Sequence, residues 1–167
     1  MTLYQTINAI EVAASRQPTI NTIVRNDVFR LNAIPDVKYG VFAWTQGQHS
    51  VGQDLQNFTF TFFYVDRLTA DKKNEVEIQS VGMQTIGNII LLLQEWGIPM
   101  QDWTAQTFNQ RFLDECAGVF ASVRIEVPVG YACAFGDTEF PGWNDDRRNQ
   151  YLEVDEMYVL NETLVIL

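Results

Sequence analysis

The chain has 167 residues, 47% of them hydrophobic and 13% aromatic, which suffices for one globular domain with a full core and excludes an intrinsically disordered segment. Its formal charge of -10, with lysine only at positions 38, 72 and 73, leaves no basic stripe to neutralise phosphates and argues against a surface that binds nucleic acid. An acidic surface repels DNA instead, which suits a passage through which DNA slides without sticking.

The sequence shows no recognisable secretory signal or membrane span. The first ten residues show no basic segment followed by a long apolar one, as a secretory signal would. The longest unbroken aliphatic run, residues 89–93, is far too short to cross a bilayer. We therefore expect a soluble protein that is made in a cytoplasm and does not contact a membrane.

The first expected elements are two helices. An apolar helical face near the start of the chain is formed by Leu3, Ile7, Ile10 and Ala14. Thr2 can cap this helix, and Pro18 ends it. A second, short helix is expected over residues 21–32, where Ile23, Val28 and Leu31 would face the core.

Two antiparallel strands are expected next. Residues 37–44 and 58–65 alternate between two faces and are rich in β-branched and aromatic side chains. Residues 46–56, between them, are mostly polar and contain Gly47 and Gly52, so they predict a loop much longer than a tight turn. We interpret this loop as one that contacts a partner, with disorder at its tip as the alternative.

A charged turn and a long helix follow. We interpret residues 70–74 as a second contact loop, and Asn74 with Glu77 three residues later predicts a capping box. Apolar residues then recur at steps of three and four until Gly97 and Pro99 end the helix. Because the strand at residues 58–65 is apolar on both faces, the helix covers one face and the other needs a different cover, such as a second copy of the chain.

The second half of the chain is expected to contain a crossover, a strand and an arm. Residues 103–112 read as a polar-aromatic crossover, and residues 117–129 as a strand that Pro128 ends. Its polar face, with Ser122, Arg124 and Glu126, would meet water or a neighbouring subunit. Residues 136–149 read as a loop, and residues 151–167 as one or two further strands.

These elements predict the α+β class, with an antiparallel sheet and helices on one of its faces. Residues 1–135 would form the main domain. Residues 136–167 would form a loop and a C-terminal strand arm, which belongs either to the same domain or to a contact between subunits.

The residues that carry chemistry do not form a catalytic set. His49 is the only histidine, and neither a nucleophile elbow nor a suitable carboxylate accompanies it and Ser50. Cys116 and Cys133 lie far apart in apolar surroundings, which indicates buried reduced thiols rather than zinc ligands. We expect no enzyme activity and no cofactor.

An acidic cluster near the C-terminus is the remaining possibility for a metal. Its oxygen-bearing members, with two neighbouring arginines, are Asp137, Glu139, Asn144, Asp145, Asp146, Arg147 and Arg148. The cluster lacks the spacing of a calcium-binding loop, so we interpret it as surface ion pairs, with a bound cation as the alternative.

The order of the elements resembles that of the ring-forming connector proteins of tailed bacteriophages. The resemblance is to small α+β tail-terminator and neck proteins, most closely those of crAss-like phages of gut bacteria. It spans about residues 37–129 and is carried by TFTFFYVDRLT at 59–69, NEVEIQS at 74–80, FNQRF at 108–112 and DECAGVFA at 114–121.

The resemblance implies a tail-terminator-like fold and a structural role in the virion. Copies of the chain would form a ring of six or twelve between portal and tail proteins, through which genomic DNA passes without specific binding. The extended C-terminal arm departs from a minimal terminator and leaves the level of the ring in the connector open. Alternatives are an assembly chaperone or binding module of the same fold, and a small hydrolase with an unrecognised site.

The residues expected at contacts between subunits come from both loops, the polar strand face and the C-terminal arm. They are Gln46, Gln48, His49, Gln53, Asp71, Lys72, Lys73, Arg124, Glu126, Leu164, Val165 and Ile166.

Overall fold

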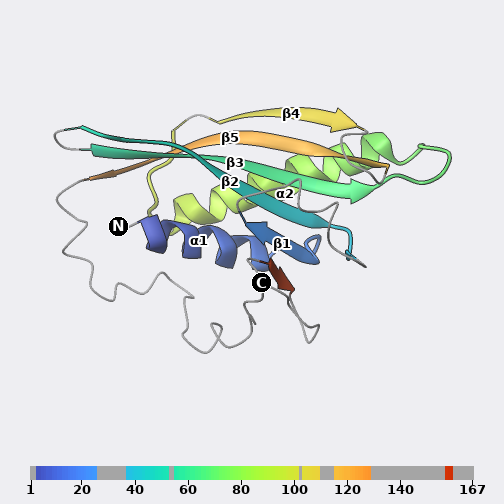
Figure 1. Ribbon diagram of the computed structural model, residues 1–167, viewed down its shortest axis with the longest axis horizontal. Helices are drawn as coiled ribbons and strands as arrows, with labels where there is room; N and C mark the ends of the chain where they lie inside the picture. Colours follow the sequence, from blue (N-terminus) through green and yellow to red (C-terminus); the bar gives the residue numbers. More distant parts are fainter. Residues whose placement is uncertain are drawn as a thin grey trace.

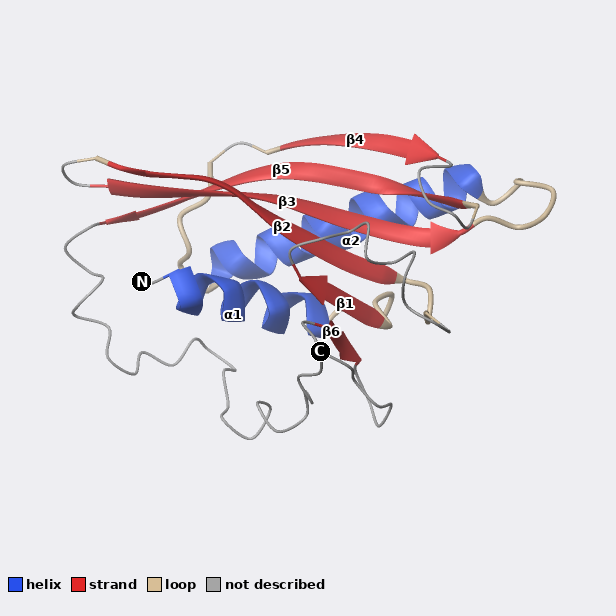
Figure 2. Cartoon of the chain, viewed as in Figure 1, coloured by secondary structure: helices blue, strands red, loops and turns tan. Residues whose placement is uncertain are grey.

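The computed structural model describes residues 3–25, 37–52, 55–101, 103–109, 115–128 and 157–159. They form a single sheet with two helices on one of its faces (Figures 1 and 2). The elements are α1 (Leu3–Ser15), β1 (Thr22–Arg25), β2 (Val41–Val51), β3 (Leu55–Arg67), α2 (Glu75–Glu95), β4 (Thr104–Asn109), β5 (Cys116–Pro128) and β6 (Met157–Val159). The α+β class expected from the sequence is confirmed.

The sheet is mixed rather than wholly antiparallel. Its strand order is β4-β5-β3-β2-β1-β6, and β3 pairs antiparallel with both β2 and β5 along most of its length. The pair β1 and β2 is parallel, whereas β6 adds to β1 in the antiparallel sense. The antiparallel pairing expected between residues 37–44 and 58–65 is confirmed for residues 41–44, whereas residues 37–40 precede β2.

The main core lies between the sheet and the two helices. Alternate side chains of β3 and β5 point toward the helices and are buried, which is the period of two read from the sequence. Helix α2 crosses β3 and β5, and its inward residues include Ile86, Ile89 and Leu93. Gly82 permits this close contact, because an added Cβ would lie 2.8 Å from Cδ1 of Tyr64.

Burial also affects the electrostatics of the core. Desolvation raises the pKa of the Tyr64 phenol, and the nearby charge of Asp66 raises it further. The Tyr64 ring packs under α2 beside Gly82.

Helix α1 is attached to the sheet by a buried ion pair. Glu11 of α1 accepts hydrogen bonds from Nε and Nη2 of Arg25 in β1, and the Nη2 to Oε2 distance is 2.7 Å. Trp44 of β2 donates its indole Nε1–H to the same carboxylate at 3.3 Å. One carboxylate thus joins α1 to two parallel strands.

The opposite face of the sheet has its own apolar cluster. Its buried members are Val24, Val41, Ala43, Val65, Phe108 and Cys116. Phe63 and Phe120 are half-buried there, with ring centroids 6.0 Å apart. Neither described helix packs on this face (Figure 2). The expectation of a strand that is apolar on both faces is confirmed.

Three local predictions are wrong. Residues 22–25 form strand β1 and not a helix, because they pair with β2 and β6. Residues 46–51 and 55–56 are not a loop but continue β2 and β3 as an extended hairpin. Residues 104–109 form strand β4, which pairs with β5, where a crossover was expected.

Several predictions fall on residues that are not described. They concern residues 26–32, Cys133, the acidic cluster at 137–148 and most of the C-terminal arm. Within the arm, residues 157–159 form the strand β6, whereas Leu164, Val165 and Ile166 lie outside the described residues.

Among the described residues, α2 alone is long and apolar enough to meet a length-and-composition test for a membrane span. Its inward face packs on the sheet, and helices in the core of a protein pass the same test.

Candidate assembly surfaces

The extended hairpin carries the first group of predicted contact residues. β1 pairs with β2 only as far as Trp44, so within the described ranges the outer edge of β2 beyond it has no neighbouring strand. Gln46, Gln48 and His49 are exposed on this segment, and a register shift between Gln46 and His49 distorts it. Gln53 lies outside the described residues. The described part of the hairpin beyond Trp44 therefore has an open outer edge.

The side chain of His49 is held by a ring contact. It stacks on Phe58 of β3 with centroids 4.7 Å apart and an interplanar angle of 17°. Ser50 accepts a long hydrogen bond of 3.5 Å from Asn57. Both contacts join β2 to β3, and neither involves a carboxylate.

A polar network on the helix-free face forms the second group. Arg124 donates to Oδ1 of Asn57 at 3.1 Å and pairs with Glu126 at 3.3 Å. Gln101 donates to the same Glu126 carboxylate at 2.6 Å. As expected, Arg124 and Glu126 lie on the polar face of β5, away from the helices. Their contact with a neighbouring subunit stays a prediction.

The turn before α2 contains the third group. Asp71 accepts hydrogen bonds from Thr69 at 2.8 Å and pairs with Lys73 at 2.8 Å. The hydrogen bond from Lys73 is the main cause that lowers the pKa of Asp71, and the hydrogen bond from Thr69 lowers it further. Lys72 has a positive φ of 55° and pairs with Glu115 at 3.0 Å. The turn is thus shaped by its own side chains.

The predicted capping box is wrong. Asn74 makes no side-chain hydrogen bond to the start of α2. Its amide instead accepts from the backbone N–H of Thr69 at 2.9 Å and donates to the carbonyl of Arg67 at 3.1 Å. Asn74 fastens the turn to the end of β3, which competes with capping for the same side chain.

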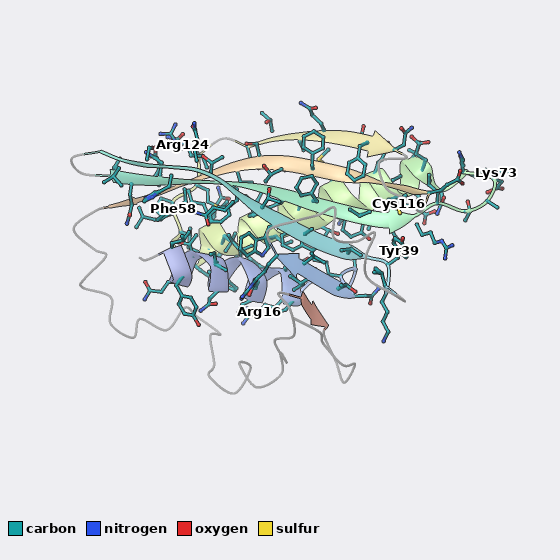
Figure 3. All side chains as sticks on the ribbon, in the orientation of Figure 1. Arg16, Tyr39, Phe58, Lys73, Cys116 and Arg124 are labelled. Carbon is teal, nitrogen blue, oxygen red and sulfur yellow. The ribbon has the colours of Figure 1, made fainter. Side chains whose placement is uncertain are left out.

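These groups do not form one site. Figure 3 shows Arg124 and Phe58 toward one end of the sheet, with Lys73, Cys116 and Tyr39 toward the other. The predicted contact residues thus lie at both ends of one molecule.

Sequence reasoning missed a fourth surface, the outward face of α2. Val76, Met83 and Leu91 are exposed there, with exposed fractions of 75%, 36% and 58%. The available signal was the absence of any charged residue between Glu77 and Glu95. Only the inward face of this helix was predicted to make contacts.

The described residues offer no metal centre, because no three His, Cys, Asp or Glu side chains among them are grouped as ligands. Cys116 is buried, as its apolar surroundings predict, and its Sγ lies 3.5 Å from the hydroxyl of Tyr39. No protein-family model matches this chain, and no curated protein matches it.

Proposed function

We propose that this chain is a structural subunit that assembles with its own copies into a ring in the head-to-tail connector of a tailed bacteriophage. The ring, of six or twelve copies, joins portal-side proteins to the tail and surrounds the passage for genomic DNA. The chain acts through its surfaces and performs no catalysis.

One observation carries the proposal: the sheet is apolar on both faces, but described helices cover only one. Phe63 and Phe120 form a half-buried aromatic pair on the second face, beside the buried cluster around Val65. A half-covered apolar sheet is typical of a subunit that completes its core in an assembly. The resemblance of residues 37–129 to tail-terminator and neck proteins implies the same role.

The net charge supports the link to DNA. A formal charge of -10 repels the phosphate backbone, so a ring of such subunits does not hold the DNA that moves through it. In the proposed ring, acidic residues face the passage.

Electron microscopy of the purified chain and mass spectrometry of purified phage particles test the proposal together. We expect closed rings and the presence of the chain in finished particles. Monomers at every concentration, or particles that lack the chain, would overturn it. The second of these outcomes would favour an assembly chaperone.

A further inference from the structure

The outward face of α2 carries a stripe of apolar and small residues. Val76, Ser80, Met83, Gly87 and Leu91 follow one another at helical steps of three and four along this exposed face. At about 1.5 Å per residue the stripe is about 22 Å long. Its three large members are the exposed hydrophobic residues of α2.

The stripe is neutral in a strongly acidic chain. The helix has no charged residue between Glu77 and Glu95, and the exposed polar positions Gln84, Asn88 and Gln94 are uncharged. Two copies with a formal charge of -10 each repel one another, and a neutral face reduces this cost where they meet. A second copy of the chain is thus the partner that this face fits.

One residue near each end of the helix is opposite in charge to the other. Lys73, with a side chain 83% exposed, precedes the first turn, and Glu95 ends the last turn. In an antiparallel pair, Lys73 lies close to Glu95 of the second copy, whereas a parallel pair sets Lys73 against Lys73. Lys73 also pairs with Asp71 of its own chain, and Glu75 and Glu77 lie in the first turn.

The register follows from the positions of the stripe. With a two-fold axis midway between Met83 and Gln84, Val76 lies opposite Leu91 of the second copy, and Ser80 lies opposite its Gly87. Gly87 has open space around it, since an added Cβ would meet no atom within 4 Å. Short side chains at both positions allow the helix axes to approach to about 8 Å at a crossing angle of about 20°.

We infer that α2 binds α2 of a second copy of this chain, antiparallel and through the stripe that runs from Val76 to Leu91. The inference rests on the proposed function, because it names one contact of a self-assembling subunit. A two-fold contact does not close a ring by itself. It joins subunits in pairs within a ring or stacks two rings back to back.

The first test is the substitution Leu91→Glu, measured by sedimentation equilibrium on the full chain. It buries a carboxylate twice in the symmetric contact, so we expect the dissociation constant of the pair to rise by about 100-fold or more. Tyr4→Glu is the matched control, because it adds the same charge to an exposed apolar residue of α1 and should leave association unchanged. Met83→Glu provides a second variant, and the thermal unfolding of each variant checks its fold.

A charge exchange tests the antiparallel arrangement. Lys73→Glu and Glu95→Lys should each weaken association by about two- to five-fold, and the two together in one chain should restore it. No recovery in the double variant would overturn the arrangement. If the wild-type chain assembles and the variants L91E and M83E assemble equally well, the α2 contact is wrong and the proposed function stands. If the wild-type chain stays monomeric, both the α2 contact and the proposed function are wrong.

Discussion

Gly118 lies in β5 opposite Val65 of β3 and Phe108 of β4, where only a glycine fits. An added Cβ would lie 1.9 Å from the carbonyl oxygen of Tyr64 and 2.8 Å from Cζ of Phe108. The first of these atoms is backbone held in the ladder, so it cannot move aside cheaply. A glycine within a strand pattern signals such a close approach, although the sequence does not say which strand comes near.

We predict that Gly118→Ala lowers the free energy of unfolding by about 3 kcal/mol, because it overpacks the centre of the sheet. Urea unfolding followed by circular dichroism measures the change. Gly87→Ala is the matched control: no atom lies near its added methyl group, so it should raise stability by about 0.5–1 kcal/mol. Equal stability of G118A and the wild type would contradict the close approach of β3 and β5.

At the scale of elements, the attachment of α1 depends on the pair Glu11 and Arg25. Their side chains are only 11% and 18% exposed, so most of their hydration is lost. We predict that Glu11→Gln costs about 3 kcal/mol of unfolding free energy, because it removes the carboxylate that pairs with the mostly buried Arg25 guanidinium.

A double-mutant cycle checks this prediction. Glu11→Gln combined with Arg25→Met should cost clearly less than the sum of the two single changes, because each single change already breaks the same ion pair. Glu95→Gln is the control, since Glu95 is an exposed carboxylate at the end of a helix and its loss should change stability by less than about 0.5 kcal/mol. Additive costs in the cycle would show that the two side chains act independently.

The elements that the sequence predicts well are those with strong periodicity and burial. β3, β5 and α2 show clear periods of two or 3.6, and their bounds agree with the expected ranges to within a few residues. The inward and outward faces of β5 were also predicted correctly from Val119 to Val127. Such patterns arise because one face of the element is buried, and they are the same whichever element covers that face.

The elements that are predicted wrongly from the sequence are strands whose pairing partners lie far away along the chain. Thr22–Arg25 is short, and its parallel partner is fixed only in three dimensions, so Ile23 fitted a helical spacing equally well. β4 and the tip of β2 are mostly polar and exposed, and they are strands because β5 and β3 offer edges to pair with. The candidate contact residues Gln46, His49 and Arg124 are exposed. The α2 stripe was missed because only the inward apolar face of this helix was considered.

At the scale of the whole molecule, the predicted contact groups lie at opposite ends of one sheet (Figure 3). The hairpin tip and Arg124 are near one end, and the turn with Lys73 is near the other, while α2 runs across the sheet between them (Figure 1). A molecule with separate contact groups at its two ends is suited to a closed ring, in which each subunit uses both. The α2 stripe would add a third direction of contact.

The final prediction concerns the C-terminal arm. Residues 157–159 pair with β1 of the same chain, so this part belongs to the chain's own sheet. Residues 161–167 end in four aliphatic side chains, among them Leu164, Val165 and Ile166, which lie outside the described residues. We expect these side chains to pack across a subunit boundary, because an exposed aliphatic string is costly in water.

Deletion of residues 161–167 separates this contact from a role in the chain's own core. We expect the shortened chain to keep its thermal unfolding midpoint, since β6 is retained, and to lose ring formation in electron microscopy. Replacing Leu164, Val165 and Ile166 by serine, at unchanged length, should have the same effect. Glu162→Gln is the control, because it alters the segment without removing apolar surface and should leave rings intact. Unfolding of the deleted chain would assign the segment to its own core, and a folded deletion variant that still forms rings would rule out the contact.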